Sequence, residues 1–300
     1  MRSGIFKQIF ILLFLVFAGD NSAVNAQGKP GVFYSISGNG LKDTSWLFGT
    51  YHLLKDSYLN EVPKVQASFR RAGSVVVEVV MDSSALPAAN AKAVLNGSLL
   101  TDYFDKAFAD SLDLALKVSI GQGIDAFRQM KPMVVMLTMS VVQLMKDNAA
   151  FLSKYTGLPL DVYFAIEKKA RQQRVIGLET MEQQMDLLFN TLQPAQQAAM
   201  LKESIRNQDA GARLGNELLR TYFSNDLEKM ATLYQASIQV SGELDFLVKK
   251  RNIAWMKQLP AILHSGSNFI AVGALHLAGE DGLVQQLRAL GYHVTEENLQ

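Results

Sequence analysis

The sequence predicts an α/β protein with a central, largely buried mixed sheet, flanking helices and a large helical insertion. Short runs of β-branched residues without clean alternation are typical of strands that are covered on both faces. Amphipathic segments separate these runs, as expected when helices connect strands of one sheet. With 300 residues, of which 49% are apolar, the chain can bury a sizeable core.

The order of the elements follows from these patterns. Strands are predicted at five places: 32–36 with its continuation at 45–49, 74–81, 174–178, 268–273 and 292–296. Helices are predicted at 59–72, 99–118, 126–146, 161–173 and 181–191. The block 194–259 has almost no strand signal and is predicted to be the helical insertion. Residues 27–300 are therefore interpreted as one α/β domain.

Residues 1–26 have the pattern of a secretory signal peptide. Arg2 and Lys7 precede the apolar run IFILLFLVFAG, and small residues at 24–26 suit a cleavage point. The run is shorter than the roughly 20 residues of a spanning helix. We therefore expect a periplasmic or secreted protein without a stable membrane anchor after cleavage; an uncleaved anchor is the alternative.

Composition narrows the classes of partner. Without residues 1–26 the chain has equal numbers of acidic and basic residues, which makes nucleic acid an unsuitable partner. The sequence contains no cysteine, so disulfides, thiol nucleophiles and thiolate metal sites are excluded. Any metal ion would need histidine, aspartate or glutamate ligands. The oligomeric state does not follow from these features.

Two of the four histidines follow the same local pattern. His52 lies in WLFGTYHL and His276 in FIAVGALHLAG, each three residues after a glycine at the end of a predicted strand. A glycine there permits a close backbone approach or a positive φ, and an imidazole three residues later can reach the carboxyl edge of the sheet. Each histidine taken singly could instead be structural. A duplication of two half-units would explain the likeness, and so would chance similarity of short strands.

Acidic and basic candidates accompany this pair. Glu78 interrupts the apolar run VVVEVV, where a carboxylate is costly unless it is paired or bound to a metal. Glu179 follows the run RVIGL, and Arg251 lies in KKRNIAWM. Two histidines and a glutamate could bind a divalent metal with positions open for water and substrate. The alternatives are a half-solvated strand for Glu78, a helix start for Glu179 and a surface base for Arg251.

Several familiar catalytic motifs are absent. The sequence has no His-Glu-x-x-His, Gly-x-Ser-x-Gly, P-loop or Gly-x-Gly-x-x-Gly pattern. Helix-borne zinc proteases, serine hydrolases with a nucleophile elbow, P-loop nucleotide enzymes and dinucleotide-binding folds are therefore not indicated.

The segments WLFGTYHLLKDSY, VVVEVVMD, VIGLETMEQQ and FIAVGALHLAGEDGLVQQLRALGYHV together resemble the TraB/GumN family, which includes the Tiki proteins. The stretch GLPLDVYFAIEKKA and the pair Arg251-Asn252 are similar as well. The resemblance implies a fold related to erythromycin esterase and ChaN-like proteins, with both Gly-x-x-His motifs at one site. In the Tiki branch such residues belong to a divalent-metal-dependent protease.

The resemblance implies a set of roles. His52, Glu78 and His276 would be metal ligands, while Glu179 and Arg251 would act in catalysis; exchanging the two glutamates fits the sequence equally well. Manganese or cobalt is the expected metal, with zinc and iron still open. The function expected is an exported metal-dependent hydrolase that cleaves a peptide or small amide. Two alternatives are a periplasmic peptide-binding protein of the pheromone-shutdown type and a haem or iron-chelate binder of the ChaN type.

Overall fold

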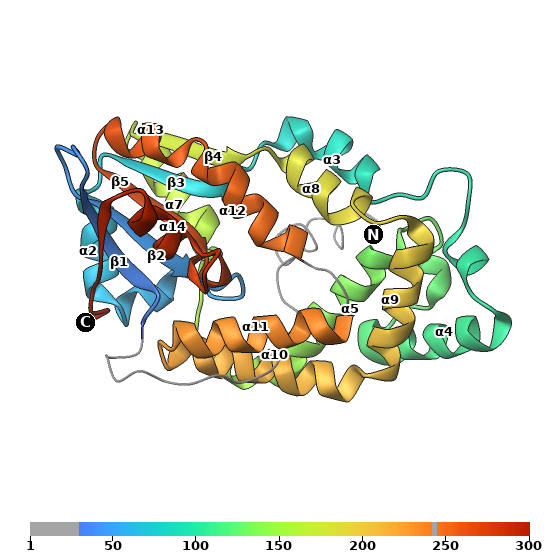
Figure 1. The fold of residues 1–300 in the computed structure, drawn as a ribbon. Coiled ribbons are helices and arrows are strands. Elements are labelled where there is room, and N and C mark those ends of the chain that lie inside the picture. The colour runs from blue at the N-terminus through green and yellow to red at the C-terminus, as the bar shows by residue number, and fades with distance from the viewer. Residues whose placement is uncertain (1–29, 242–244) are drawn as a thin grey trace.

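The computed structural model describes residues 30–241 and 245–300 (Figure 1). The predicted signal peptide, residues 1–26, lies outside the described residues. Among the described helices, none combines the length and apolar character needed to cross a membrane. The apolar run 133–145 belongs to helix α5 (Pro132–Asp147), most of whose residues are buried inside the protein.

One six-stranded mixed sheet organises the fold, in the order β4-β3-β5-β2-β1-β6. Strands β4, β3, β5 and β2 run parallel to one another, whereas β1 pairs antiparallel with both β2 and β6. The strands are β1 (Phe33–Gly38), β2 (Ser45–Thr50), β3 (Ser74–Val79), β4 (Arg174–Glu179), β5 (Asn268–Gly273) and β6 (Tyr292–Glu296). Strands β2, β3 and β5 are almost entirely buried, which explains their continuous apolar runs, whereas the edge strand β4 is mostly half-buried.

Helices cover the two faces of the sheet in the order that right-handed crossovers require. Helices α2 (Pro63–Arg71) and α7 (Leu160–Ala170) lie in the connections that lead from β2 toward β4, and they cover one face. The chain then turns back across the sheet, so α12 (Lys249–Met256), α13 (Leu259–His264) and α14 (Leu283–Ala289) cover the other face (Figure 1).

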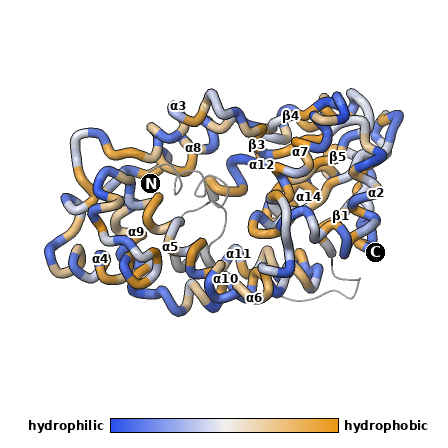
Figure 2. Tube along the Cα trace, turned by 180° about the vertical axis from the view of Figure 1, so that it is seen from behind, coloured by the Kyte–Doolittle hydropathy of each residue, from blue (hydrophilic) through white to orange (hydrophobic). Residues whose placement is uncertain are grey.

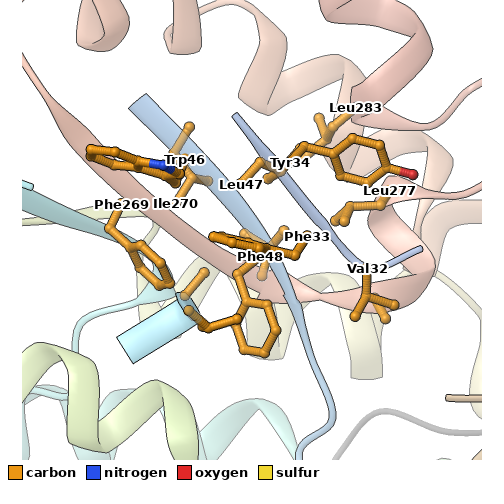
Figure 3. Packing of buried hydrophobic residues seen from close by; sticks show 14 of the residues in the cluster. Val32, Phe33, Tyr34, Trp46, Leu47, Phe48, Phe269, Ile270, Leu277 and Leu283 are labelled. Carbon is orange, nitrogen blue, oxygen red and sulfur yellow. The ribbon is translucent and has the colours of Figure 1, made fainter. Parts of the chain in front are cut away.

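Aromatic side chains fill the layer between the sheet and α2 and α7. Phe69 and Phe164 from the two helices lie 4.8 Å apart between ring centroids, and Phe269 of β5 lies 5.4 Å from Phe69 and 5.1 Å from Phe164. Figure 3 shows Phe269 beside Phe48 within the same buried cluster. Burial of each such ring contributes about 1.5–3 kcal/mol, so this layer fixes the helices on the sheet.

A second hydrophobic core lies in a helical region at the other end of the molecule (Figure 1). Its helices come from two inserts, one between β3 and α7 and one between β4 and α12. The helices that build it are α3 (Leu86–Lys92), α4 (Lys106–Ile120), α5, α8 (Met181–Asn190) and α9 (Pro194–Arg206). The same inserts also contain the short α6 (Ala149–Leu152), α10 (Gln208–Phe223) and α11 (Leu227–Ser241), whose apolar residues pack with the core of the sheet. Figure 2 shows hydrophobic stretches running through the strands of the sheet.

The predicted α/β class is confirmed, and several elements begin or end elsewhere than expected. Strands β5 and β6 have the predicted bounds. Segments 32–36 and 45–49, expected as one continued strand, are separate antiparallel strands because a turn at 38–44 reverses the chain. Strand β3 ends at Val79 and not at residue 81. The described residues of the block 194–259 are largely helical as expected, and α12 near its end packs beside the sheet.

Candidate active site

The site lies where the four parallel strands reach their carboxyl ends. His52 follows the end of β2, Glu78 and Glu179 lie at the ends of the paired strands β3 and β4, and His276 follows β5. Because β5 lies between β3 and β2, the two histidine-bearing strands are neighbours. Carboxyl ends of parallel strands meet at one edge, which is where ligands bind in open α/β sheets.

Glycines in the two Gly-x-x-His motifs allow close packing at this edge. A Cβ on Gly49 would lie 2.8 Å from Cα of Ala274, so only glycine lets β2 approach the 3₁₀ turn η6 (Ala274–Leu277). Gly273 has φ −53°, so its motif does not depend on a positive φ. A Cβ on Gly273 would lie 3.3 Å from both Nε2 of His52 and Oε1 of Glu78, and 3.6 Å from Cδ2 of His276. Both imidazoles and one carboxylate therefore converge on one point.

His52 forms a dyad with an aspartate from α7. Its Nδ1 lies 2.9 Å from Oδ2 of Asp161, and the hydroxyl of Thr50 donates to Oδ1 of the same carboxylate at 2.9 Å. An ionised carboxylate only accepts, so Nδ1 carries a proton and Nε2 can act as the acceptor of a neutral ring. Burial disfavours the charged imidazole, but the hydrogen bond and charge of Asp161, together with Glu78, raise the pKa of His52 above its usual value.

His276 has different partners. The side-chain amide of Asn252 donates to the backbone oxygens of His276 and Asp281, which turns its Oδ1 toward Nδ1 of His276 at 2.7 Å. Nδ1 therefore carries the proton, and Nε2 accepts from Nη1 of Arg251 at 2.8 Å. Burial, followed by the positive charge of Arg251, lowers the pKa of His276 well below its usual value.

Arg251 binds the two glutamates. Its Nη2 contacts Oε2 of Glu78 at 2.6 Å and Oε1 of Glu179 at 2.5 Å, and its Nε donates to Glu179 at 3.0 Å. The Arg251 side chain is 1% exposed, and its guanidinium stacks on Trp255, with 4.5 Å from Cζ to the ring centroid. Burial alone would lower the pKa of Arg251, but Glu78 and Glu179 raise it. A buried charge so paired avoids the penalty of isolation.

Glu78 is held as a carboxylate. Burial alone would raise its pKa, but Arg251, His276 and His52, in that order, together with a 2.7 Å hydrogen bond from the backbone nitrogen of Gly273, bring the pKa far below its usual value. One oxygen thus contacts β5 and the other contacts Arg251. The strand glutamate is therefore paired, as the cost of an unpaired buried carboxylate requires.

A pocket of about 280 Å³ opens beside these residues, between the end of β3 and helix α7. His52, Glu78 and Asp161 line its polar end, while valine, methionine and isoleucine side chains line its walls. His276, Glu179 and Arg251 are not among the lining residues. All five side chains expected at the site lie close together in the structure. Only His52 and Glu78 among them line the pocket. Their catalytic or ligating roles stay predictions.

The arrangement does not fit the predicted divalent metal. Nε2 of His276 and Oε2 of Glu78, two of the intended donor atoms, both contact the guanidinium of Arg251. A cation bound there would have to compete with Arg251 for the same lone pairs and would face its positive charge. Within residues 30–241 and 245–300, no group of three or more acidic, histidine or cysteine side chains could hold a metal ion.

Sequence reasoning missed Asp161, Asn252 and Trp255. Asp161 is in the first turn of α7, where an acidic residue is also expected for the helix dipole alone, so its pattern is not specific. Asn252 directly follows Arg251 on α12, and Trp255 lies one turn further along the helix. All three side chains therefore lie against His276. Helical spacing from Arg251 was the available signal for Trp255.

The fold defines an α/β protein, and the histidine and glutamate side chains at the ends of its parallel strands define a candidate site at the carboxyl edge of the sheet. The family model for the TraB/PrgY/gumN family matches residues 32–296, and the chain belongs to this family. It is similar to the uncharacterized protein YbaP of Shigella flexneri, with 23% identity over 264 residues, which cover 86% of this chain and 92% of that protein. YbaP of Escherichia coli K12 is 32% identical over 132 residues, which cover 42% of this chain and 47% of the relative.

Proposed function

We propose that the protein is a hydrolase that cleaves an amide bond of a peptide in the pocket between β3 and α7. The observation that carries the proposal is the pair formed by His52 and Asp161, whose nitrogen and oxygen lie 2.9 Å apart at the polar end of a pocket of about 280 Å³. A histidine whose pKa is raised by a neighbouring carboxylate is suited to act as a general base.

The reaction can be written with residues that line the pocket. Nε2 of His52 accepts a proton from a water molecule, whose oxygen attacks the amide carbonyl. The imidazolium that forms is stabilised by Asp161 and Glu78, the two carboxylates that raise its pKa. His52 then gives the proton to the leaving nitrogen as the carbon–nitrogen bond breaks. The products are a carboxylic acid and an amine, and the base returns to its neutral form.

Arg251 does not line the pocket, and it supports this chemistry by positioning Glu78. Arg251 binds one oxygen of Glu78, and the backbone nitrogen of Gly273 binds the other. The carboxylate is thereby held near Nε2 of His52. We therefore assign Arg251, Glu179 and His276 as positioning residues, in place of the catalytic roles expected for Arg251 and Glu179 and the metal-ligand role expected for His276. Placement of a reacting group to within a fraction of an ångström is worth large factors in rate.

Metal dependence and export stay predictions. A metal bound by His52, Glu78 and His276 would supply a more acidic water and a polarised carbonyl. Binding it would first require Arg251 to leave Glu78 and His276. Export to the periplasm or medium is supported by the signal-peptide pattern of residues 1–26.

Peptide binding without turnover is the second candidate. One observation favours it: of the two Gly-x-x-His histidines, only His52 lines the pocket, while His276 is 2% exposed. A protein that only sequesters a peptide would need the pocket and its walls, and would not need an active base.

The test is peptide-library profiling of residues 27–300 at pH 7, before and after chelation and with added manganese or cobalt. We expect turnover that falls by about 10²–10⁴-fold in His52→Ala, the range for loss of a general base. His264→Ala is the matched control, because His264 lies on α13 outside the pocket. Turnover that His52→Ala leaves intact would overturn the proposal, and turnover seen only with added metal would overturn its metal-free form.

A further inference from the structure

The pocket has a direction, because its polar groups and its one lysine lie at opposite ends of α7. Asp161 is in the first turn of this helix, and Lys169 lies eight residues further along. At 1.5 Å per residue, the two positions are separated by about 12 Å along the helix axis. The pocket therefore extends over more than one residue of an extended peptide.

The walls between these ends are apolar. On the helix side, Val162, Ala165 and Ile166 share a face with Lys169, since spacings of three, four and seven residues fall on one side of a helix. Val80 and Met81, which follow β3, line the opposite side.

Three of the wall residues are more exposed than large apolar side chains usually are. Val80 is 39% exposed, Met81 46% and Ile166 49%, and all three line the same pocket. An apolar ligand that covered them would gain about 25 cal/mol for each Å² removed from water. Contiguous exposed apolar surface beside polar groups is typical of a binding groove.

The charges at the two ends of the pocket indicate which way a peptide would lie in it. Glu78 and Asp161 make the end near His52 acidic, so a carboxylate would be repelled there. Lys169 is exposed at the other end, and within the part of the chain that the structure describes it forms no ion pair shorter than 4.0 Å. Asp82 is the acidic group across the rim whose charge interacts with Lys169, and its carboxylate is already bound by the backbone nitrogen and hydroxyl of Ser84.

We infer that the pocket selects peptides with a free C-terminus, placing three or four apolar residues along α7 and the terminal carboxylate at Lys169. The length follows from about 12 Å of groove at 3.3–3.6 Å per extended residue. This inference rests on the proposed function, because the bond that is cut would be the amide that precedes these residues, held at His52. The released product is a short apolar peptide.

The experiment compares two probes that differ in one group: an acetylated pentapeptide, alanine followed by four leucines, as its free acid and as its C-terminal amide. Turnover is measured with wild type and Lys169→Gln, and binding of both probes is measured by calorimetry with His52→Ala. We expect the free acid to have the lower KM, and Lys169→Gln to raise that KM roughly threefold to fivefold, the range of an exposed ion pair, without changing kcat or the amide's KM.

Lys42→Gln is the matched control, because Lys42 is an exposed lysine in the turn between β1 and β2 and does not line the pocket. Equal KM and equal binding for acid and amide, or a Lys169→Gln effect no larger than that of Lys42→Gln, would overturn the inference even if turnover is observed. Selective binding of the acid without any turnover would support the inference and overturn the hydrolase proposal. Absence of both binding and turnover would overturn both.

Discussion

The two histidines of the repeated Gly-x-x-His motif differ in almost every chemical respect. His52 lines the pocket, pairs with a carboxylate and has a raised pKa. His276 is buried beneath Trp255, pairs with an amide and a guanidinium, and has a lowered pKa. The same local sequence therefore places an imidazole at the sheet edge, while its partners decide whether it is a base or a structural acceptor.

The largest effect is expected for the stability of Arg251→Met, which changes the surroundings of the buried His276. This change leaves Glu78 and Glu179 buried without their cation, a loss of about 3–5 kcal/mol for a buried pair. Urea unfolding of the variant measures it. Arg213→Met, at an exposed position on α10, is the control and should change stability by less than about 0.5 kcal/mol. Equal stability of the two variants would show that the buried cluster does not hold the core.

The next largest effect is expected for the catalytic activity that we assign to His52. Asp161→Asn keeps the shape of the dyad but removes the charge that orients and stabilises the imidazolium, so kcat should fall by about 10²-fold or more. Because Asp161 raises the pKa of His52, the acid limb of the kcat/KM profile should move to lower pH. Asp209→Asn, on exposed α10 surface, is the control. An unmoved acid limb would contradict the assignment of His52 as the base.

Opposite pKa shifts predict opposite pH dependences of stability. His276 stays neutral in the folded protein, so the unfolded chain binds more protons and stability falls as pH drops through about 6.5. His52 has a raised pKa, so its contribution is present below about 6.5 and is lost as pH rises through the folded value.

Urea unfolding from pH 5 to pH 8 separates these contributions. His276→Gln should flatten the loss of stability on the acidic side, whereas His52→Gln should flatten the loss on the neutral side. Each unit of pKa shift corresponds to about 1.4 kcal/mol, which sets the scale of the change. If both variants altered the same limb, the contrast between the two histidines would be wrong.

The smallest expected effect is that of Thr50→Val. It removes the hydroxyl that donates to Oδ1 of Asp161 while keeping the side-chain shape. One hydrogen bond to a charged group is worth about 1.5–3 kcal/mol when it is lost, part of which water can restore near a pocket. We expect kcat to fall less than tenfold, with KM unchanged. Thr232→Val, on α11, is the control. A drop as large as that of Asp161→Asn would mean that Thr50 itself acts in the reaction.

Much of the fold was predictable because strand and helix patterns are local. The predicted strands 268–273 and 292–296 match the structure, and Glu179 lies at a strand end as expected. Glu78, expected inside a strand, lies near the end of β3 because this strand stops at Val79. The turn between β1 and β2 was missed, since a continued run and a hairpin give similar patterns over so few residues. Asp161 was missed because its partner is 109 residues away in the sequence.

By itself, the sequence determined the class of fold and most of its strands, and it predicted that the two histidines would meet at one edge, since parallel strands carry their carboxyl ends to the same side. The tertiary structure alone decided which of them face the pocket. Arg251 comes from a helix 173 residues after Glu78 and lies between the groups that were expected to bind a metal. Burial, charge and hydrogen bonding set the pKa of each side chain, and these depend on distances that long-range packing fixes.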